Sequence, residues 1–414
     1  MSKAFSKLSL VLTAAATAGL VVTAPALAKV DGDTIILGSA ISLTGKYSTN
    51  GIHAQNGYEL AVKMINEAGG VKVGGKSYKM KVVYYDDEST PARGAQLAER
   101  LIKQDGVKYM LGPYSSGLTK AIAPVTEKYQ IPMVEAEGAS RSLFTQGYKY
   151  LFAVLSTSEQ YLASSIALAA ELAEQNGRKP SDVKIAMAFE NDPFSLDVRA
   201  GVEEDAKKYG MKIVVDDKLP RDLNDMSATL TKVKALKPDL LVVSGHSKGA
   251  ATAARQIGEM KVGVPMVAMT HCEAAKIVSK FGAVTNDFLC PTQWAETLSY
   301  KDDLFGTAAD YDALFKKTYA GYKNVPYQAA QASAAVQVWK DAFERANSFD
   351  VDKVRQALAD TNLSTFYGQI KFAKAGNNIA KPMVLRQIQN GEYNVVAPSK
   401  WASHKVNYPR MMPK

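Results

Sequence analysis

The feature that most constrains this chain is a regular alternation of short apolar segments with helical segments along most of its 414 residues. Several apolar segments are continuous, as in LLVV at residues 240–243, which is typical of strands buried on both faces of a parallel sheet. The predicted strands cover residues 35–41, 79–85, 109–112, 132–135, 184–189, 212–215, 239–244, 265–270 and 288–291. Helices between such strands form right-handed crossovers, so the pattern predicts an α/β fold with doubly wound sheets.

The segments between the predicted strands have helical patterns. Residues 54–68 carry apolar side chains at helical spacing, and Pro91 suits the first position of the next helix. Residues 384–396 indicate a β-hairpin, because Asn390-Gly391 is a strong signal for a tight turn. The chain is too long for one comfortable core, and its two strand-helix series resemble each other, so we expect two similar lobes.

The first 28 residues have the pattern of a secretory signal peptide. Lys3 and Lys7 give a positive start, residues 8–22 form an apolar run, and residues 26–28 (Ala-Leu-Ala) supply a small-x-small cleavage site. The alternative is a membrane anchor, but the run is shorter than the about 20 residues needed to span a bilayer. We therefore expect export, with cleavage near Ala28.

The charge distribution argues against nucleic acid as a partner. Lysine and arginine (50) exceed aspartate and glutamate (41), for a formal net charge of +9, yet the two signs are interspersed and no basic block with aromatic residues occurs. No phosphate-binding loop of the G-x-x-x-x-G-K-[ST] type is present, so the chain should not bind ATP itself. We expect no cofactor.

Two cysteines occur, Cys272 and Cys290. In an exported protein they could form a disulfide, and two free buried thiols are the alternative. Neither has a second Cys or His at metal-ligand spacing around it, so we expect no metal site there.

Small polar residues follow two neighbouring predicted strands. Residues 113–117 (PYSSG) precede a helix through Tyr129, and residues 136–140 (AEGAS) follow the next strand. Ligands bind at the carboxyl ends of parallel strands, where hydroxyls and helix N-terminal N–H groups suit a carboxylate. Serine and glycine are also common helix caps, so these loops alone do not separate a binding site from ordinary capping.

At these residues the chain resembles the periplasmic branched-chain amino-acid (leucine/isoleucine/valine) binding protein family, which has the type I solute-binding fold. The resemblance covers residues 29–398 and rests on the order and spacing of several short motifs. These are SLTG at 42–45, Gly57 and Ala61, INEAGG at 65–70, YDD at 85–87 with Pro91, GPYSS at 112–116 and Gly147-Tyr148.

The resemblance implies two Rossmann-like lobes joined by three crossovers, which close on a ligand by a hinge motion. The N-terminal lobe would comprise residues 29–153 and 294–382, and the C-terminal lobe residues 154–293 and 383–414. It also implies a periplasmic, non-enzymatic substrate-binding component of an ABC transporter, which captures a small carboxylate-bearing ligand and passes it to a membrane permease. We expect a monomer.

The family's binding positions fall on both lobes. Ser116 matches the serine that holds the ligand carboxylate, and Ala139 falls where the family has a threonine. Phe194 and His246 fall at aromatic contacts of the second lobe. The ligand-binding candidates are Tyr114, Ser115, Ser116, Glu137, Gly138, Ala139, Ser140, Phe194, His246, Thr270, His271 and Trp294.

The chain departs from the family pattern at two places. Thr270 and His271 fall where the family has an acidic residue that pairs with the ligand ammonium, and the nearest carboxylate in sequence is Glu273. A buried ammonium without a counter-charge is unfavourable, so an aromatic acid competes with an amino acid as the ligand. The disulfide of the family's first lobe falls at Ser89 and Ser115.

Two other functions fit parts of the sequence. Residues 245–249 match G-x-S-x-G with a strand before and a helix after, which is the context of a hydrolase nucleophile at Ser247, with His271 or His404 as base. No HGGG-type oxyanion loop accompanies it. A sensor that signals ligand occupancy to a membrane receptor would use the same fold as a transport protein, and the sequence does not separate the two.

Overall fold

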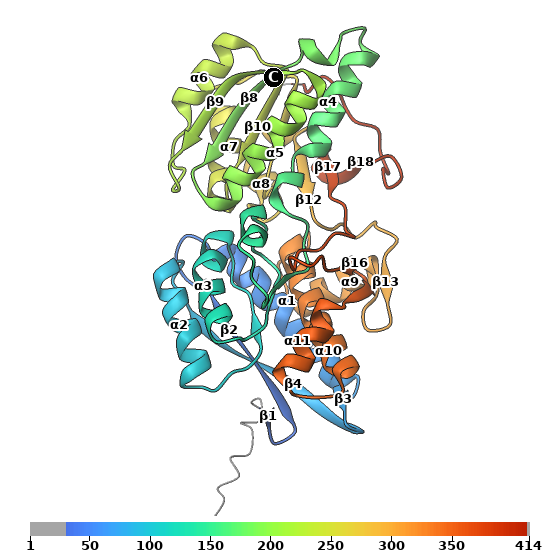
Figure 1. The fold of residues 1–414 in the computed structure, drawn as a ribbon. Helices are drawn as coiled ribbons and strands as arrows, with labels where there is room; N and C mark the ends of the chain where they lie inside the picture. Colours follow the sequence, from blue (N-terminus) through green and yellow to red (C-terminus); the bar gives the residue numbers. More distant parts are fainter. Residues whose placement is uncertain (1–29, 412–414) are drawn as a thin grey trace, which may run out of the picture.

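A computed structural model describes residues 30–411, so the predicted signal peptide lies outside the described residues. Two open sheets form the centres of two lobes, which lie one above the other in Figure 1. The first sheet has the order β3-β4-β2-β5-β6-β7, with β1 beside β2. Its strands are β1 (Val30–Asp31), β2 (Thr34–Ile41), β3 (Val71–Val73), β4 (Lys76–Asp86), β5 (Met110–Leu111), β6 (Met133–Glu135) and β7 (Leu151–Ala153).

The second sheet has the order β18-β17-β12-β11-β10-β8-β9. Its strands are β8 (Lys184–Glu190), β9 (Lys212–Leu219), β10 (Leu240–Ser244), β11 (Met266–Met269), β12 (Leu289–Thr292), β17 (Val384–Gln389) and β18 (Glu392–Ala397). Strands β8 to β12 pair in parallel, whereas β17 and β18 add an antiparallel hairpin. The parallel part repeats the order of the first sheet (β4-β2-β5-β6-β7), so both lobes have the same doubly wound topology, as the sequence predicted.

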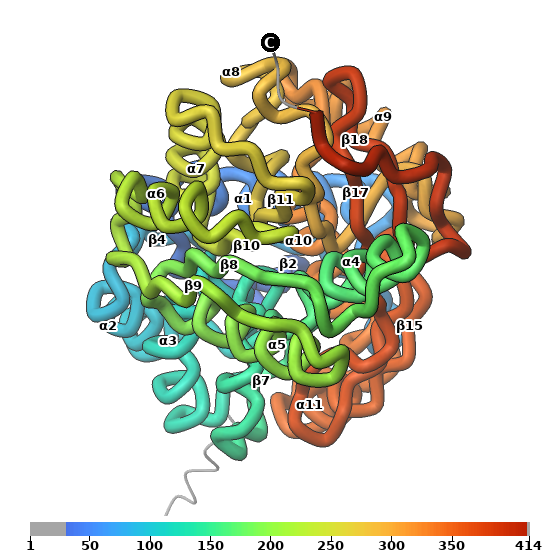
Figure 2. The backbone as a smooth tube through the Cα atoms, turned by 90° about the horizontal axis from the view of Figure 1, so that it is seen from above, coloured from blue at the N-terminus to red at the C-terminus, as the bar shows by residue number. Residues whose placement is uncertain are grey.

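Helices cover both faces of each sheet, as continuously apolar strands require. Ile35 and Leu37 of β2 pack in one cluster with α1 and α10, and Ile36 packs on the other face with α2 and α3. In the second lobe, α4 and α5 lie on one side of β8 and β10, and α7 lies on the other (Figure 2). The helices are α1 (Ser48–Glu67), α2 (Pro91–Lys103), α3 (Ser116–Lys128), α4 (Ala163–Gln175), α5 (Pro193–Tyr209), α6 (Ser227–Leu236), α7 (Ser247–Glu259), α8 (Ile277–Phe281), α9 (Ala308–Thr318), α10 (Tyr327–Ala346) and α11 (Val351–Ala359).

The C-terminal third returns to the N-terminal lobe before the final hairpin. Helix α10 packs along α1, and this close approach depends on Gly57, because a Cβ there would lie 2.2 Å from the carbonyl oxygen of Ala329. Two small hairpins complete this lobe: β13 (Lys301–Asp302) with β14 (Gly306–Thr307), and β15 (Asn362–Thr365) with β16 (Gly368–Lys371).

Within residues 30–411 the chain passes between the two sheets three times: after β7, after β12 and before β17. Ser156, Gln293 and Lys381 lie at these passages and join them. The Ser156 N–H donates to Gln293 Oε1 (3.1 Å), and Gln293 Nε2 donates to the Ser156 carbonyl (2.9 Å). Ser156 Oγ donates to the Lys381 carbonyl (2.6 Å). The lobe boundaries expected from the sequence, after residues 153, 293 and 382, stay predictions.

The observed elements differ from the predicted ones mainly at their ends. Helix α1 begins at Ser48, six residues before the predicted start at residue 54. Gly51 and its polar neighbours concealed this first turn, where a Cβ at Gly51 would lie 1.8 Å from the Ser42 carbonyl oxygen. The predicted hairpin is confirmed, with Asn390 and Gly391 both at positive φ (53° and 80°), as its tight turn requires.

The two cysteines form a disulfide inside the second lobe. Cys272 follows β11, Cys290 lies in the neighbouring β12, and both are fully buried. The bond therefore pins the loop after β11, which carries His271, to the adjacent strand.

Replacing both cysteines, as in Cys272→Ala with Cys290→Ala, should lower the free energy of unfolding by about 3 kcal/mol, because the bond closes a loop between residues 18 apart in sequence and restricts the unfolded chain. Urea unfolding of the mature protein measures this. A reductant should destabilise the wild type and leave the double variant unchanged. Equal stability of the oxidised wild type and the double variant would contradict the prediction.

Candidate functional site

The topological switch points of the two sheets face each other across the lobe junction. The strand order reverses between β2 and β5 in the first sheet and between β8 and β10 in the second, and open α/β sheets bind ligands at the strand ends there. Tyr114 and Ser115 follow β5, Asp192 follows β8, and His246 follows β10. These segments meet at the centre of the molecule.

A cavity of about 10 Å³, which is room for about one water molecule, lies between these strand ends, with walls from both lobes. Its lining residues are Tyr114, Ser115, Ser116, Glu137, Tyr161, Phe194, His246, His271, Tyr327 and Gln331. Seven of the twelve residues proposed from the sequence are among them, so the structure brings most of the predicted set together.

The phenol of Tyr114 bridges the lobes inside this cavity. Its oxygen lies 2.6 Å from His246 Nδ1 and 3.0 Å from His271 Nε2. Burial, reinforced by the neighbouring His246, lowers the pKa of His271 to about 3, so this imidazole is neutral at physiological pH. His271 also has a φ of 64°, a conformation uncommon for residues other than glycine, which marks a locally constrained backbone.

Ser115 and Ser116 place the N-terminus of α3 at the cavity wall. Ser115 is the N-cap residue but makes no side-chain capping bond, and Ser116 Oγ accepts a hydrogen bond from the Ser140 N–H (3.1 Å). The first N–H groups of a helix carry partial positive charge. A carboxylate in the cavity could accept hydrogen bonds from these N–H groups and from a serine hydroxyl.

Two buried glutamates, the last residue of β6 (Glu135) and Glu137 just after it, have different surroundings. Glu135 accepts hydrogen bonds from the N–H groups of Glu137 (2.5 Å) and Gly138 (2.7 Å), and burial still raises its pKa to about 7. Glu137 faces the cavity, accepts one bond from Gln331 Nε2 (2.9 Å), and burial raises its pKa well above the usual range. Its Oε1 has no hydrogen-bond partner among residues 30–411. The site therefore favours a protonated Glu137 that can exchange a hydrogen bond with a ligand.

Gly138, Ala139 and Ser140, three of the predicted ligand-binding residues, follow Glu137 in the same loop but do not line the cavity. At Gly138 a Cβ would lie 2.3 Å from Thr119 Oγ1, so the backbone passes too close for a side chain. The carbonyl of Ala139 accepts a hydrogen bond from the Ser158 N–H (2.8 Å). Ser140 faces the other lobe. Their observed contacts support the loop, and a direct contact with a ligand stays a prediction.

Thr270 and Trp294 also lie outside the cavity lining. Thr270 Oγ1 donates to the Gly245 carbonyl (2.9 Å) and joins the ends of β10 and β11. Trp294 Nε1 donates to the Phe366 carbonyl (3.2 Å), and its ring packs on Tyr311, whose centroid is 5.6 Å away. Trp294 therefore belongs to the packing of the N-terminal lobe.

Sequence reasoning missed Tyr161, Tyr327 and Gln331. Tyr161 follows the first passage between the lobes and packs edge-on against Phe194 (5.0 Å between ring centroids). Tyr327 and Gln331 lie one turn apart at the start of α10, far in sequence from the other lining residues. An aromatic and an amide on one face of an otherwise alanine-rich helix were the signal that could have found them.

The G-x-S-x-G segment is an interlobe contact. Ser247 Oγ donates to Asn50 Oδ1 of the N-terminal lobe (2.8 Å) rather than to a histidine. His271 is engaged by Tyr114, and the exposed His404 contacts Ser403. The two glycines of the motif make room for the fully buried Glu190, because a Cβ at residue 245 or 249 would lie 2.8 or 2.5 Å from Glu190 Oε1.

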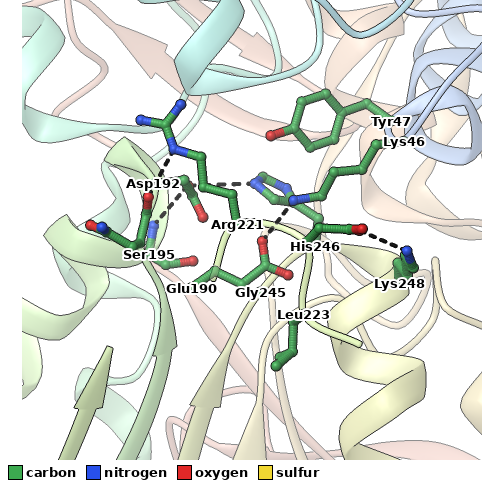
Figure 3. A network of polar contacts seen from close by, with 12 residues as sticks. Lys46, Tyr47, Glu190, Asp192, Ser195, Arg221, Leu223, Gly245, His246 and Lys248 are labelled. Atoms are coloured by element: carbon green, nitrogen blue, oxygen red, sulfur yellow. Dashed lines mark hydrogen bonds and ion pairs between the residues drawn. The ribbon is translucent and has the colours of Figure 1, made fainter. Parts of the chain in front are cut away.

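The lobes are in contact around the cavity. Lys46 of the N-terminal lobe reaches across and donates to Glu190 Oε2 (3.0 Å), as Figure 3 shows. Ser140 donates to Asp197 of α5, and Arg141 pairs with Glu204 (2.9 Å). In each of these pairs the N-terminal lobe supplies the hydrogen-bond donor or cation and the C-terminal lobe supplies the carboxylate.

A chain of polar contacts connects the cavity with the passages between the lobes. Glu137 is bonded to Gln331, and the Tyr367 hydroxyl lies 3.2 Å from both Gln331 Oε1 and Gln293 Oε1, so its single proton is shared between these two acceptors. Lys381 Nζ in turn donates to the Gln293 carbonyl. Burial lowers the pKa of Lys381 from 10.5 to about 7.

Comparison with known proteins decides the family. Residues 34–392 match the periplasmic binding protein family model. The chain belongs to this family. Leu/Ile/Val-binding protein homolog 8 of Brucella abortus (strain 2308) is 24% identical over 379 residues, 90% of this chain and 92% of the relative. The family comprises non-enzymatic solute-binding proteins, so the hydrolase interpretation of Ser247 is wrong, and the prediction of a non-enzyme is confirmed.

Solved structures of the same family share the fold. The branched-chain amino acid transporter substrate-binding protein LivJ from Streptococcus pneumoniae, in complex with isoleucine, has a TM-score of 0.74 at 23% identity and covers 88% of this chain and 100% of that one. A solute-binding protein from R. palustris, in complex with 4-hydroxybenzoate, has a TM-score of 0.73 at 20% identity, covering 92% and 98%. These matches confirm the type I fold. No helix within residues 30–411 has the length and apolar character of a membrane span.

The buried Lys381 should make stability depend on pH. Between its folded pKa of about 7 and its ordinary 10.5, the unfolded chain binds a proton that the folded protein does not, so stability rises with pH in this window and is lost as pH falls toward 7. Urea unfolding at about pH 7.5 and about pH 9.5 should show a rise that is about 2 kcal/mol smaller in Lys381→Met. The same rise in both proteins would contradict a neutral Lys381.

Proposed function

We propose that this protein is the periplasmic substrate-binding component of an ABC transporter, exported as a monomer after cleavage near Ala28. It closes its lobes on a small carboxylate-bearing ligand and passes that ligand to a membrane permease. The observation that supports this most directly is the cavity at the two facing switch points, where the buried polar groups of Ser116, Glu137 and His271 converge from both lobes.

The ligand carboxylate would lie at the N-terminus of α3. Ser115 and Ser116 supply hydroxyls there, and no arginine or lysine is among the residues lining the cavity. The apolar part of the ligand would then lie among the rings of Tyr161, Phe194 and Tyr327. Aromatic walls with a few convergent polar groups are typical of sites for small ligands.

An amino-acid ligand would need a carboxylate in the cavity as the counter-charge for its ammonium group. The buried carboxyl groups therefore decide between the two ligand classes. Glu273 is committed to a buried ion pair with Arg386 and lies at a separate groove beside Lys276. Glu137 is the carboxyl group that lines the cavity, and burial favours its neutral form. A protonated Glu137 and a neutral His271 suit a phenolic hydroxyl better than an ammonium. We therefore propose an aromatic acid, of the hydroxybenzoate class, as the ligand.

A thermal-shift screen of the mature protein tests the ligand class. The panel contains benzoate, hydroxybenzoates and phenylacetate against leucine, valine and phenylalanine. A ligand at 100 times its dissociation constant stabilises the folded state by about 2.7 kcal/mol, which raises the melting temperature by several degrees. A shift with the aromatic acids supports the proposal. A shift with amino acids alone would overturn the aromatic class, and a flat panel would overturn both classes.

Ser116→Ala should weaken binding of the ligand identified by that screen by about 1–3 kcal/mol, because the carboxylate loses a hydrogen-bond donor in a buried site. Isothermal titration calorimetry measures the change. Ser364→Ala is the matched control, since that hydroxyl is exposed and bonds only to Gln369. Unchanged affinity in Ser116→Ala would remove the serine from the carboxylate site.

Glu137→Gln separates the two ligand classes. Glutamine keeps the shape and hydrogen-bonding capacity of a neutral glutamic acid, so an aromatic acid should retain its affinity within about threefold. An amino acid that relied on the Glu137 carboxylate as its counter-ion should lose affinity by at least about tenfold. The same titration calorimetry reports both, and a tenfold loss with a hydroxybenzoate would contradict the protonated state.

A further inference from the structure

We propose that Glu190, Asp192 and His246 form a divalent-cation site on the C-terminal lobe. The ammonium of Lys46, which extends from the N-terminal lobe, competes with the cation for this site. One ligand atom from each of the three lies within 4.8 Å of the other two. All three side chains are at least nine-tenths buried. No sequence motif marks the group, because its members lie at the ends of two different strands, β8 and β10.

Neighbouring groups hold the side chains of Glu190, Asp192 and His246 in position. Asp192 caps α5, and its Oδ1 accepts the N–H groups of Phe194 (2.9 Å) and Ser195 (3.2 Å), while Oδ2 has no hydrogen-bond partner among the described residues. Glu190 is confined by the glycines at 245 and 249. Such outer contacts fix ligand geometry in metal sites.

The imidazole of His246 supplies the second, independent indication. Its Nδ1 contacts the Tyr114 hydroxyl (2.6 Å), which orients the ring. Its Nε2 points at the carboxylates, 3.5 Å from Asp192 Oδ1, and has no hydrogen-bond partner within residues 30–411 (Figure 3). A buried ring nitrogen aimed at two carboxylates, with its other nitrogen held, is the arrangement of a metal-ligating histidine.

The chemistry of the set suits zinc. One imidazole nitrogen and two carboxylate oxygens give three protein ligands and leave a coordination position for water. Tetrahedral bonds of about 2.1 Å place ligand atoms about 3.4 Å apart, so the widest pair needs to draw together by about 1.4 Å. Side chains that end in carboxylates can make this adjustment once they no longer contact Lys46.

The contact of Lys46 with Glu190 makes cation binding depend on whether the lobes are open or closed. In the closed arrangement its ammonium neutralises Glu190, and the exposed Arg221 donates to the Asn191 carbonyl (2.9 Å), next to Asp192 in sequence (Figure 3). When the lobes part, Lys46 leaves with the N-terminal lobe, and two adjacent carboxylates remain without it. Like charges at this separation repel, so a divalent cation would bind there in the open form. Cation binding and closure on Lys46 then exclude each other.

Titration of ZnCl2 into tag-free mature protein stripped with EDTA tests the site and needs no organic ligand, so its outcome is independent of the proposed ligand class. We expect one equivalent to bind to the wild type by calorimetry. Asp192→Asn should weaken binding by at least tenfold while leaving α5 capped, because asparagine is an equally good N-cap. Lys46→Met should tighten binding by at least tenfold, because the competitor is gone.

Two variants serve as matched controls. Lys248→Met removes a lysine of the same cleft rim whose partner is the exposed Asp222, and His404→Ala removes an exposed histidine. Both should leave zinc affinity unchanged. Small-angle scattering should show a larger radius of gyration with zinc than without it. The proposal is overturned if neither the wild type nor Lys46→Met binds zinc, if Asp192→Asn binds as tightly as the wild type, or if Lys46→Met binds no more tightly.

Discussion

Three hydrogen-bonded residues at the passages between the lobes determine how this molecule can move. Ser156, Gln293 and Lys381 belong to segments far apart in sequence, yet each satisfies a buried polar group of another. Because buried polar groups lose their partners when strands separate, the three passages must bend together. We therefore expect the two lobes to move about one hinge at these passages.

The hinge and the cavity share a continuous set of polar contacts. Tyr367 bonds to Gln293 at the passages and to Gln331 at the cavity, and Gln331 bonds to Glu137. A ligand that engages Glu137 therefore acts on the same network that holds the three passages together. Low-dielectric surroundings strengthen every bond in such a chain when it is complete and penalise every gap.

The sequence predicted the architecture well because most of the parallel strands are continuously apolar and alternate with helices. The strand ends also placed Tyr114 and Ser116 in one loop at the predicted site, and the family resemblance added His271, which lies beside Tyr114. The contribution of α10 was not accessible, because Tyr327 joins the cavity only through the return of the chain to the first lobe. Likewise, the packing of Glu190 against two glycines made an ordinary strand-to-helix turn imitate a hydrolase motif.

The contacts between the lobes are unevenly divided by charge. Lys46 and Arg141 extend from the N-terminal lobe, whereas Glu190, Asp197 and Glu204 extend from the C-terminal lobe. In an open molecule these oppositely charged groups would attract each other before any contact forms. Attraction between exposed charges fades over a Debye length of about 8 Å at physiological ionic strength. Added salt should therefore slow the closure of the lobes more than it weakens the closed form.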